Sequence, residues 1–148
     1  MTIRSAVRAD LSEVALLERA ARSTPWTESR FARELELDVS RVWVAEACDR
    51  KPANLAGLLV FWMVGDEVQI HDVAVAPERR REGIATALLG RLIDHAHSHN
   101  ARQITLEVRE ENTGAIALYE SLEFEIMGRR EAYYPDTGEA ALLMTRHL

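Results

Sequence analysis

The chain has 148 residues, 47% of them hydrophobic, a length and apolar content that predict one domain over residues 1–148 with a core that needs no disulfide. Its single cysteine, Cys48, excludes an internal disulfide framework and a cysteine-rich zinc site, and indicates a reducing, cytoplasmic compartment. The formal net charge of −6 argues against nonspecific nucleic-acid binding, which needs an excess of lysine and arginine, and favours a cationic partner.

The first third of the chain is predicted to fold as one strand followed by two helices. Residues 2–7 can form a short strand. Asp10, with Glu13 three positions later, matches a capping box, so a helix should run from there to about Ala21. Thr27 can cap the second helix.

Three strands are predicted next, at residues 41–46, 55–63 and 67–75. Their connectors are short and contain Pro52-Ala53-Asn54 and Gly65-Asp66. Strands so closely spaced should pair as an antiparallel meander.

The second half of the chain alternates helices and strands. Apolar residues at helical spacing predict helices over about 83–97 and 114–122, and polar–apolar alternation predicts strands over 103–109, 124–134 and 140–146. The helix that follows the third meander strand should return to a parallel neighbour by a right-handed crossover. We therefore expect an α+β fold of order β-α-α-β-β-β-α-β-α-β-β, with a mixed, mostly antiparallel sheet and helices on both faces.

A basic loop lies between the strand that ends near Val75 and the helix that begins near Gly83. A helix N-terminus offers unpaired N–H groups and the positive end of the helix dipole, and glycine allows a phosphate to come close. The pattern Arg80-x-x-Gly83-x-Ala85 therefore predicts a site for a phosphorylated ligand, the alternative being an ordinary loop with solvated arginines. Residues 107–114 should emerge at the same cleft.

Three segments, residues 73–75, 80–85 and 112–124, resemble the GCN5-related N-acetyltransferase (GNAT) superfamily in their order and separation. Pro25-Trp26-Thr27-Glu28, Leu106-Glu107-Val108-Arg109 and the segment 129–135 narrow the resemblance to ribosomal-protein alanine N-acetyltransferases of the RimI type. It covers essentially the whole chain. It implies transfer of acetyl from acetyl-CoA to the α-amino group of a protein, the N-terminal Ala of a small-subunit ribosomal protein, by direct attack in a ternary complex.

The resemblance also implies the coenzyme-binding residues. The pyrophosphate would lie on the N–H groups of residues 81–86, and the pantetheine arm would pair with the backbone of residues 73–75. The implied set is Val73, Ala74, Val75, Arg80, Arg81, Glu82, Gly83, Ile84, Ala85, Thr86 and Asn112. An Asn at such a junction is also a common turn or cap residue.

The catalytic pair implied by the resemblance is Glu107 and Tyr119. An α-amino group with a pKa near ~7.7–8 can give its proton to a carboxylate, directly or through water, and Glu107 would be that base. Tyr119, a phenol with an ordinary pKa of ~10, would protonate the departing thiolate. Backbone N–H groups near residues 73–75 would meet the oxyanion. The alternative for Glu107 is a surface carboxylate. The alternative for Tyr119 is a core aromatic residue whose hydroxyl is already hydrogen-bonded.

Trp26, Arg129, Tyr133 and Tyr134 would line the acceptor side if the RimI-type resemblance extends to it. Neighbouring residues on a strand point to opposite faces, so only one of the two tyrosines is expected to face the peptide. The expected partner is the basic N-terminus of a ribosomal protein, with no nucleic acid and no membrane. Two alternatives remain open: acetylation of a lysine or small amine, and a module that binds acyl-CoA without turnover.

Two further features bear on the site. Glu123 stands where relatives usually have Gly, so it must adopt a left-handed conformation at a cost of roughly 1 kcal/mol or the helix must end differently. His95 and His99 lie one helical turn apart, but no carboxylate has ligand spacing beside them, and we expect no metal site. No apolar run approaches the roughly 20 residues that span a bilayer.

Overall fold

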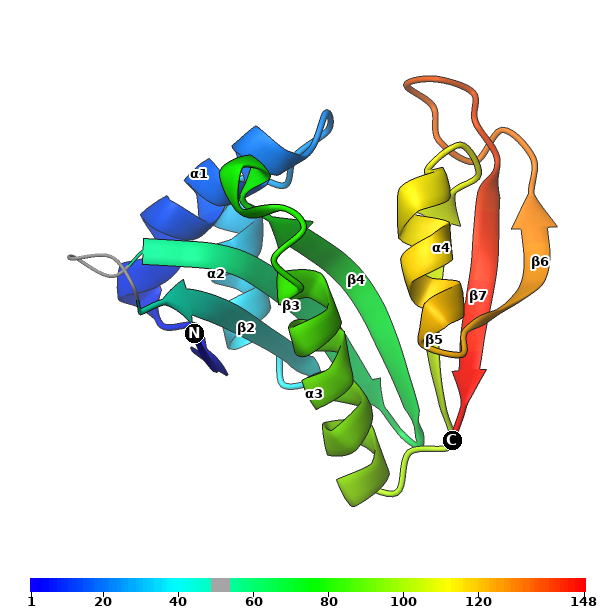
Figure 1. Cartoon of the computed structure of the whole chain (residues 1–148), viewed down its shortest axis with the longest axis horizontal. Helices are drawn as coiled ribbons and strands as arrows, with labels where there is room; N and C mark the ends of the chain where they lie inside the picture. Colours follow the sequence, from blue (N-terminus) through cyan, green and yellow to red (C-terminus); the bar gives the residue numbers. More distant parts are fainter. Residues whose placement is uncertain (49–53) are drawn as a thin grey trace.

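A computed structural model describes residues 1–48 and 54–148. Figure 1 shows the chain, with α-helices and strands in the order β1 (Thr2–Ser5), α1 (Leu11–Ala21), α2 (Glu28–Glu36), β2 (Ser40–Ala47), β3 (Asn54–Val64), β4 (Glu67–Val75), α3 (Ile84–Ser98), β5 (Gln103–Arg109), α4 (Thr113–Ser121), β6 (Glu125–Arg130) and β7 (Ala141–His147). Short 3-10 turns precede α1 and follow β4, at Arg8–Asp10 (η1) and Pro77–Arg79 (η2). The predicted element order is confirmed.

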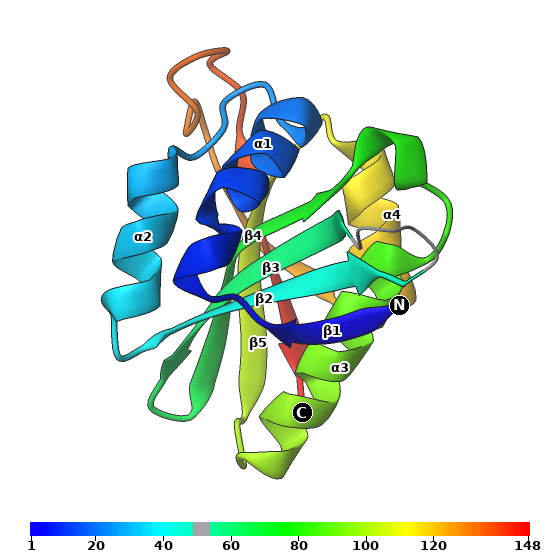
Figure 2. The same cartoon turned by 90° about the vertical axis from the view of Figure 1, so that its left-hand side faces the viewer.

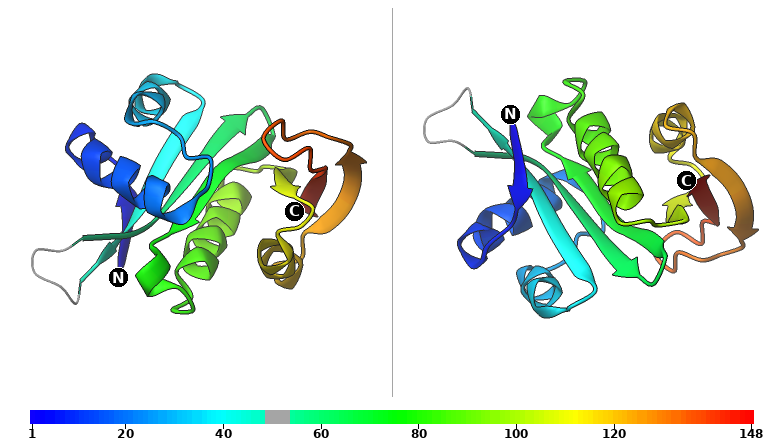
Figure 3. Two further views of the ribbon diagram at one scale, coloured as in Figure 1. Left: turned by 90° about the horizontal axis from the view of Figure 1, so that it is seen from above. Right: turned by 90° about the horizontal axis from the view of Figure 1, so that it is seen from below.

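The strands form one seven-stranded sheet in the order β1-β2-β3-β4-β5-β7-β6. All neighbours are antiparallel except β4 and β5, which are parallel, as the crossover predicted. Helices α1 and α2 cover one face and α3 and α4 the other (Figure 2, Figure 3). We call these the α1/α2 face and the α3/α4 face. The predicted α+β class with helices on both faces is confirmed.

Each face has its own hydrophobic core. Val14 of α1 and Phe31 of α2 pack with sheet residues such as Leu58 on the α1/α2 face. On the α3/α4 face, Leu88 of α3 and Tyr119 of α4 belong to one larger cluster. The sheet is therefore fixed from both sides, and the strands that carry the site have little freedom to shift.

Strands β4 and β5 pair over a short length only. Their aligned residues are Glu67–Gln69 of β4 and Gln103–Thr105 of β5, although both strands continue well beyond. Figure 1 shows the two strands together at one end and apart at the other. The sheet thus divides between the two strands.

A β-bulge in β4 lies just after the last paired residue. Asp72 aligns with Val60 and Ile70 with the next residue of β3, so His71 is the extra residue. A bulge bends its strand and reverses the alternation of side chains. Ile70 accordingly packs on the α3/α4 face, whereas Ala74 packs on the α1/α2 face.

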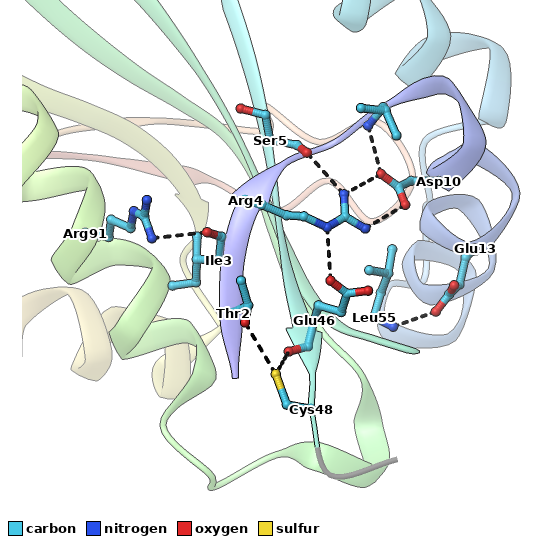
Figure 4. Close-up of polar contacts among 11 residues, drawn as sticks. Thr2, Ile3, Arg4, Ser5, Asp10, Glu13, Glu46, Cys48, Leu55 and Arg91 are labelled. Atoms are coloured by element: carbon cyan, nitrogen blue, oxygen red, sulfur yellow. Dashed lines mark hydrogen bonds and ion pairs between the residues drawn. The ribbon is translucent and has the colours of Figure 1, made fainter. Parts of the chain in front are cut away.

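The predicted capping box at the start of α1 is wrong. The side chain of Asp10 makes no cap hydrogen bond into the helix. Its carboxylate instead accepts from Arg4 Nη1 and Nη2, at 2.8 and 2.9 Å, and from the backbone N–H of Val7 at 2.8 Å. The Glu13 carboxylate accepts from the backbone N–H of Leu55 (Figure 4). The carboxylates of Asp10 and Glu13 are bound by donors on β1 and β3, respectively, so they do not form the reciprocal hydrogen bonds of a capping box.

The start of α2 follows the prediction. The hydroxyl of Thr27 accepts a hydrogen bond from the backbone N–H of Arg30 at 3.2 Å. Of the predicted connector before β3, Pro52 and Ala53 lie outside the described residues, and Asn54 already belongs to the strand. Within the described ranges, no helix is long and apolar enough to cross a membrane.

The end of α4 resolves the two alternatives for Glu123. Its φ is +69°, in the left-handed region. The N–H of Glu123 donates to the carbonyl of Glu120, and the N–H of Phe124 donates to the carbonyl of Tyr119, both at 3.0 Å. This pair of bonds is a Schellman motif with glutamate at the position that glycine usually takes.

The predicted strand over residues 124–134 is too long. Strand β6 ends at Arg130, and Ala132 has a φ of +49°, which breaks the extended conformation. The N–H of Tyr134 donates to the carbonyl of Glu139 at 3.1 Å, and the N–H of Gly138 donates to the carbonyl of Tyr134 at 2.8 Å. Residues 131–140 therefore form a folded loop between β6 and β7.

Candidate active site

The separation of β4 and β5 opens a cleft of about 910 Å³. Its walls come from both strands, from the connection between α1 and α2, from α4 and from the loop over residues 131–140. Of the predicted site residues, those that line it are Trp26, Val73, Glu107, Asn112, Tyr119, Tyr133 and Tyr134. Segments far apart in the sequence therefore meet in one cavity.

Glu107 lies on β5 with its side chain toward the α1/α2 face. Leu106 and Val108, its neighbours, are buried in the cluster on the other face, so alternation turns Glu107 away from that core. The side chain keeps 31% exposure, and Oε1 lies 3.6 Å from Arg130 Nη1. A hydrogen bond to Glu107 is the main cause that raises the pKa of the Tyr133 phenol. The carboxylate is thus held at the cleft wall and can accept a proton.

Tyr119 reaches the cleft from α4, on the opposite face. It is 9% exposed and packs edge-on against Phe124 with ring centroids 5.7 Å apart. Burial, followed by the nearby charge of Asp72, raises the pKa of Tyr119 to about 12. The phenol therefore stays protonated at neutral pH.

The loop before α3 has the backbone that an anion site needs. Gly83, the N-cap of α3, has a φ of +78°, and Arg81 has a φ of +68°. A Cβ at Gly83 would meet no atom within 4 Å, so the space beside it is open. The first turn of α3 contains no acidic residue. The first N–H groups of the helix have no intrahelical acceptor, and the loop fits a phosphate group.

The edge of β4 beside the cleft offers backbone groups to a ligand. Residues Val73 and Val75 align with Leu59 and Gly57 of β3 on one side. On the other side, the aligned pairs with β5 end at Gln69. An extended ligand chain can pair there as a further strand would. Together with the α3 N-terminus, this edge fits a long molecule that carries a phosphate.

The acceptor side differs from the prediction at the tyrosines. Tyr133 and Tyr134 lie in the loop after β6, with ring centroids 5.0 Å apart in a T-shaped arrangement, and both line the cleft. The expectation that only one of them faces the site is wrong, because the pair does not lie on a regular strand. The Arg109 guanidinium lies 4.0 Å from the ring centroid of Tyr134.

Arg129 does not line the cleft, although it was expected on the acceptor side. It lies on β6, pairs with Glu131, and its Nη2 donates to Glu110 Oε1 at 3.1 Å. Ala74, Val75 and residues 80–86 also lie outside the cleft lining. The phosphate loop is therefore a separate part of the candidate site.

Among the lining residues that were not anticipated are Arg22, His71 and Asp72, and Glu18 lies next to Arg22 without lining the cleft. The side chains of Glu18 and Asp72 are fully buried, and Arg22 contacts both carboxylates. A sequence signal existed for Glu18, because it stands one turn after Val14 on the apolar stripe of α1. His71 is the extra residue of the bulge, and burial lowers its pKa.

The histidines of α3 have an aromatic environment. The ring of His95 lies 5.2 Å from that of Trp43 and 5.8 Å from that of Phe61, and burial lowers its pKa. In the part of the chain that the structure describes, no group of three or more His, Cys, Asp or Glu side chains could hold a metal ion.

Comparison with known proteins identifies the class of enzyme. Residues 11–124 match the model of the acetyltransferase (GNAT) family, and the chain belongs to this family. The protein is therefore an acyltransferase, as the motifs predicted.

The relatives narrow the comparison. The chain is 34% identical to the [ribosomal protein bS18]-alanine N-acetyltransferase of Escherichia coli K12, over 97% of this chain and 95% of that protein. It is also 34% identical to a putative enzyme of the same name from Bacillus subtilis, over 91% of this chain and 87% of that protein. The crystal structure of the E. coli ribosomal-protein-S18-alanine N-acetyltransferase superposes with a TM-score of 0.89 at 32% identity, over 99% of this chain and 92% of that one. The RimI-type resemblance is confirmed.

Proposed function

We propose that the protein transfers an acetyl group from acetyl-CoA to the N-terminal α-amino group of a protein, by direct attack in a ternary complex. The observation that carries the proposal is the placement of Glu107 and Tyr119 in one cleft, approached from opposite faces of the divided sheet. One group can take a proton from an amine while the other gives a proton to a thiolate. The reaction is expected in the cytoplasm.

The N-terminal alanine of a small-subunit ribosomal protein is the proposed acceptor. The names of the E. coli and B. subtilis relatives support this choice. The charge of the chain supports a basic acceptor segment, because the net charge is −6. Glu67 and Glu107 both line the cleft and can attract it electrostatically.

Acetyl-CoA, when bound, supplies a thioester whose carbonyl carbon accepts the amine. Residues 81–86 would hold its pyrophosphate on backbone N–H groups, and the Arg80 side chain would approach its phosphates. Residues 73–75 would pair with its extended arm and place their N–H groups at the oxyanion. Asn112 caps α4 by accepting from the N–H of Ala115 at 3.2 Å, and its place in the cleft lining supports a coenzyme contact as well.

Glu107 is the proposed base. An ammonium that arrives from the α1/α2 face meets this carboxylate beside the Tyr133 hydroxyl. The carboxylate takes the proton directly or through one water, and the neutral amine can then attack. Trp26, Tyr133 and Tyr134 would form the aromatic walls around the acceptor.

Tyr119 is the proposed acid. Its pKa of about 12 keeps the proton on the phenol before reaction. A thiol has an ordinary pKa of about 8.5, so the Tyr119 phenol is a weak proton donor to the thiolate. It nevertheless remains protonated at neutral pH. Proton donation as the carbon–sulfur bond breaks completes the transfer.

An assay of several amines tests the acceptor class. The protein is incubated with acetyl-CoA and a basic peptide that begins Ala-Arg, and mass spectrometry locates the added acetyl group. We expect acetylation of the α-amine, with little reaction of free lysine, spermidine or the same peptide with a blocked N-terminus and an internal lysine. Preference for the polyamine or the internal lysine would overturn the proposal in favour of a sibling activity.

A substitution at Glu107 separates an enzyme from a module that only binds acyl-CoA. Glu107→Gln keeps the shape of the side chain and removes the base, so kcat should fall by about 10²–10⁴. Calorimetry should give an unchanged Kd for acetyl-CoA. The matched control is Glu111→Gln, in the exposed turn after β5, which should retain kcat. Equal rates for the wild type and Glu107→Gln would refute the assigned role.

A further inference from the structure

Two carboxyl groups are buried behind the acceptor wall of the cleft. Glu18 lies on α1 and Asp72 on β4, and both side chains are 0% exposed. Asp72 follows the bulge residue His71 and comes directly before Val73, in the strand that borders the cleft. Burial of two ionised carboxylates is strongly unfavourable unless each has compensating charge and hydrogen bonds.

Among residues 1–48 and 54–148, the compensation for these two carboxyl groups is one guanidinium and one backbone N–H. Arg22 forms an ion pair with Oδ1 of Asp72, and its Nε lies 3.9 Å from Oε2 of Glu18. The N–H of Trp26 donates to Oε2 of Glu18 at 3.0 Å. Among the described residues, the buried atoms Glu18 Oε1 and Asp72 Oδ2 have no hydrogen-bond donor. One cation and one amide therefore face two carboxyl groups.

A single proton resolves this imbalance. Burial and the neighbouring carboxyl of Asp72 raise the pKa of Glu18 to about 8. One protonated carboxyl can donate to the other, and the pair then carries one negative charge opposite Arg22. Two coupled carboxyl groups that share one proton behave in this way when like charges are close.

The other groups around the pair belong to the candidate site. The charges of Asp72 and Arg22 both act on the pKa of the Tyr119 phenol, which approaches from α4. Arg22, Trp26 and Asp72 line the cleft itself. The pair is therefore placed to influence the acceptor side of the cleft.

We propose that Glu18 and Asp72 are positioning residues that share one proton and hold the Trp26 segment, between α1 and α2, against β4. With the proton present, Glu18 can hold both Asp72 and the Trp26 N–H. When the proton leaves to solvent, two carboxylates oppose one guanidinium and repel each other. The ionised Glu18 still accepts from the Trp26 N–H, so its repulsion from Asp72 displaces the carboxylate and the Trp26 segment together away from β4, and the acceptor binds less tightly. The link to a peptide acceptor rests on the proposed function.

The protonation state of the pair is measured without any assay of activity. Carboxyl groups of the full chain are labelled with ¹³C and followed by NMR from pH 5 to pH 10. We expect one carboxyl resonance that titrates near pH 8 in the wild type and is missing in Glu18→Gln. Glu34→Gln is the matched control, because Glu34 is also a buried glutamate, but it accepts from Ser40 and Trp62. The alkaline titration should persist in that variant.

The effect on positioning is measured by comparing the KM of the peptide with the KM of acetyl-CoA. If only the proton-sharing form binds the acceptor, the peptide KM rises about fivefold between pH 8 and pH 9, as the competent fraction falls. The KM of acetyl-CoA should show no matching rise. In Glu18→Gln the amide can donate to Asp72 and accept from Trp26 at every pH, so the peptide KM should lose this dependence.

Asp72→Asn provides a second variant in case Glu18→Gln does not fold. Its amide can donate to Glu18 and its oxygen can accept from Arg22, so the shared proton is no longer needed. Absence of a carboxyl that titrates above pH 7 in the wild type would overturn the proposal. An equal alkaline rise of the peptide KM in the wild type and in the folded variants would also overturn it. If no peptide is acetylated, the proposed function fails, and the NMR titration still decides the question of the pair.

Discussion

Gln69 and Thr105 are the last residues that β4 and β5 hold in register, and beyond them the two strands separate. The bulge at His71 follows two residues later. It turns Asp72 toward α1 and presents the following backbone to the cleft. One irregularity therefore provides both the opening for a ligand and the buried carboxyl of the positioning pair.

The division of the sheet also separates the two candidate catalytic groups. Glu107 belongs to the α1/α2 side, and Tyr119 belongs to the core of the α3/α4 side. An amine that enters from one side and a thioester that lies along the other would meet between them. The direct attack that we propose depends on this arrangement.

Replacement of Tyr119 by Phe should lower kcat by about 10²–10⁴, because it removes the proton donor and keeps the ring. The Tm should change little, since contact with Phe124 is preserved. Because the pKa of Tyr119 is about 12, the wild type should lose no activity through its ionisation between pH 6 and pH 10. Thiol release in steady-state assays measures kcat and its pH dependence, and thermal denaturation measures the Tm. A Tyr119→Phe enzyme with wild-type kcat would exclude the phenol as the acid.

Gly83→Ala should weaken coenzyme binding several-fold and lower the free energy of unfolding by about 1–2 kcal/mol. The cost is conformational: φ is +78° and a Cβ would meet no atom within 4 Å. Gly90→Ala is the control on the same helix, where alanine should raise the free energy of unfolding by about 0.8–1 kcal/mol. Its Kd for acetyl-CoA should match that of the wild type. Equal Kd values for both variants would contradict a role of the α3 N-terminus.

Much of the fold could be predicted from local patterns. Alternation and helical spacing predicted the element order, and the strand–helix–strand crossover predicted the parallel pair of β4 and β5. Local patterns failed where partners are distant in sequence. Asp10 matched a cap but binds Arg4 of β1, and no local signal marks the positive φ of Ala132 that ends β6.

The candidate site was predictable to a similar degree. The motif match gave Glu107 and Tyr119, and the glycine pattern gave the loop at Gly83. The pair of Glu18 and Asp72 was missed, because only the folded chain brings α1 against β4. A buried carboxylate on an apolar stripe is a signal for such a pair, but it does not identify the partner.

Gly57→Ala should both destabilise the protein and weaken coenzyme binding. A Cβ at this position would lie 2.8 Å from Ile84 Cγ2 and 3.2 Å from the carbonyl oxygen of Ala74. Ile84 is the first residue of α3, so relief of the overlap moves the start of α3 and the phosphate loop away from β3. We expect a loss of about 1–3 kcal/mol in the free energy of unfolding and a higher Kd for acetyl-CoA.

Gly128→Ala is the strand control for that substitution. Its nearest neighbour would be Leu143 Cβ at 4.0 Å, so the methyl group has room. Urea denaturation and calorimetry should give nearly wild-type values for it. If Gly57→Ala gave the same values, close approach of α3 to β3 would not constrain the loop.

Glu123→Gly should stabilise the protein by about 0.5–1 kcal/mol, because glycine adopts the left-handed C′ conformation without a Cβ penalty. The change removes an ion pair with Arg146 at 2.8 Å, but the Glu123 side chain is 80% exposed, and such a pair contributes little. Glu120→Gly, on the exposed side of the same helix, is the matched control and should cost about 1 kcal/mol. Thermal denaturation should therefore shift in opposite directions for the two variants. A decrease of Tm in both would mean that the Arg146 contact outweighs the backbone strain at Glu123.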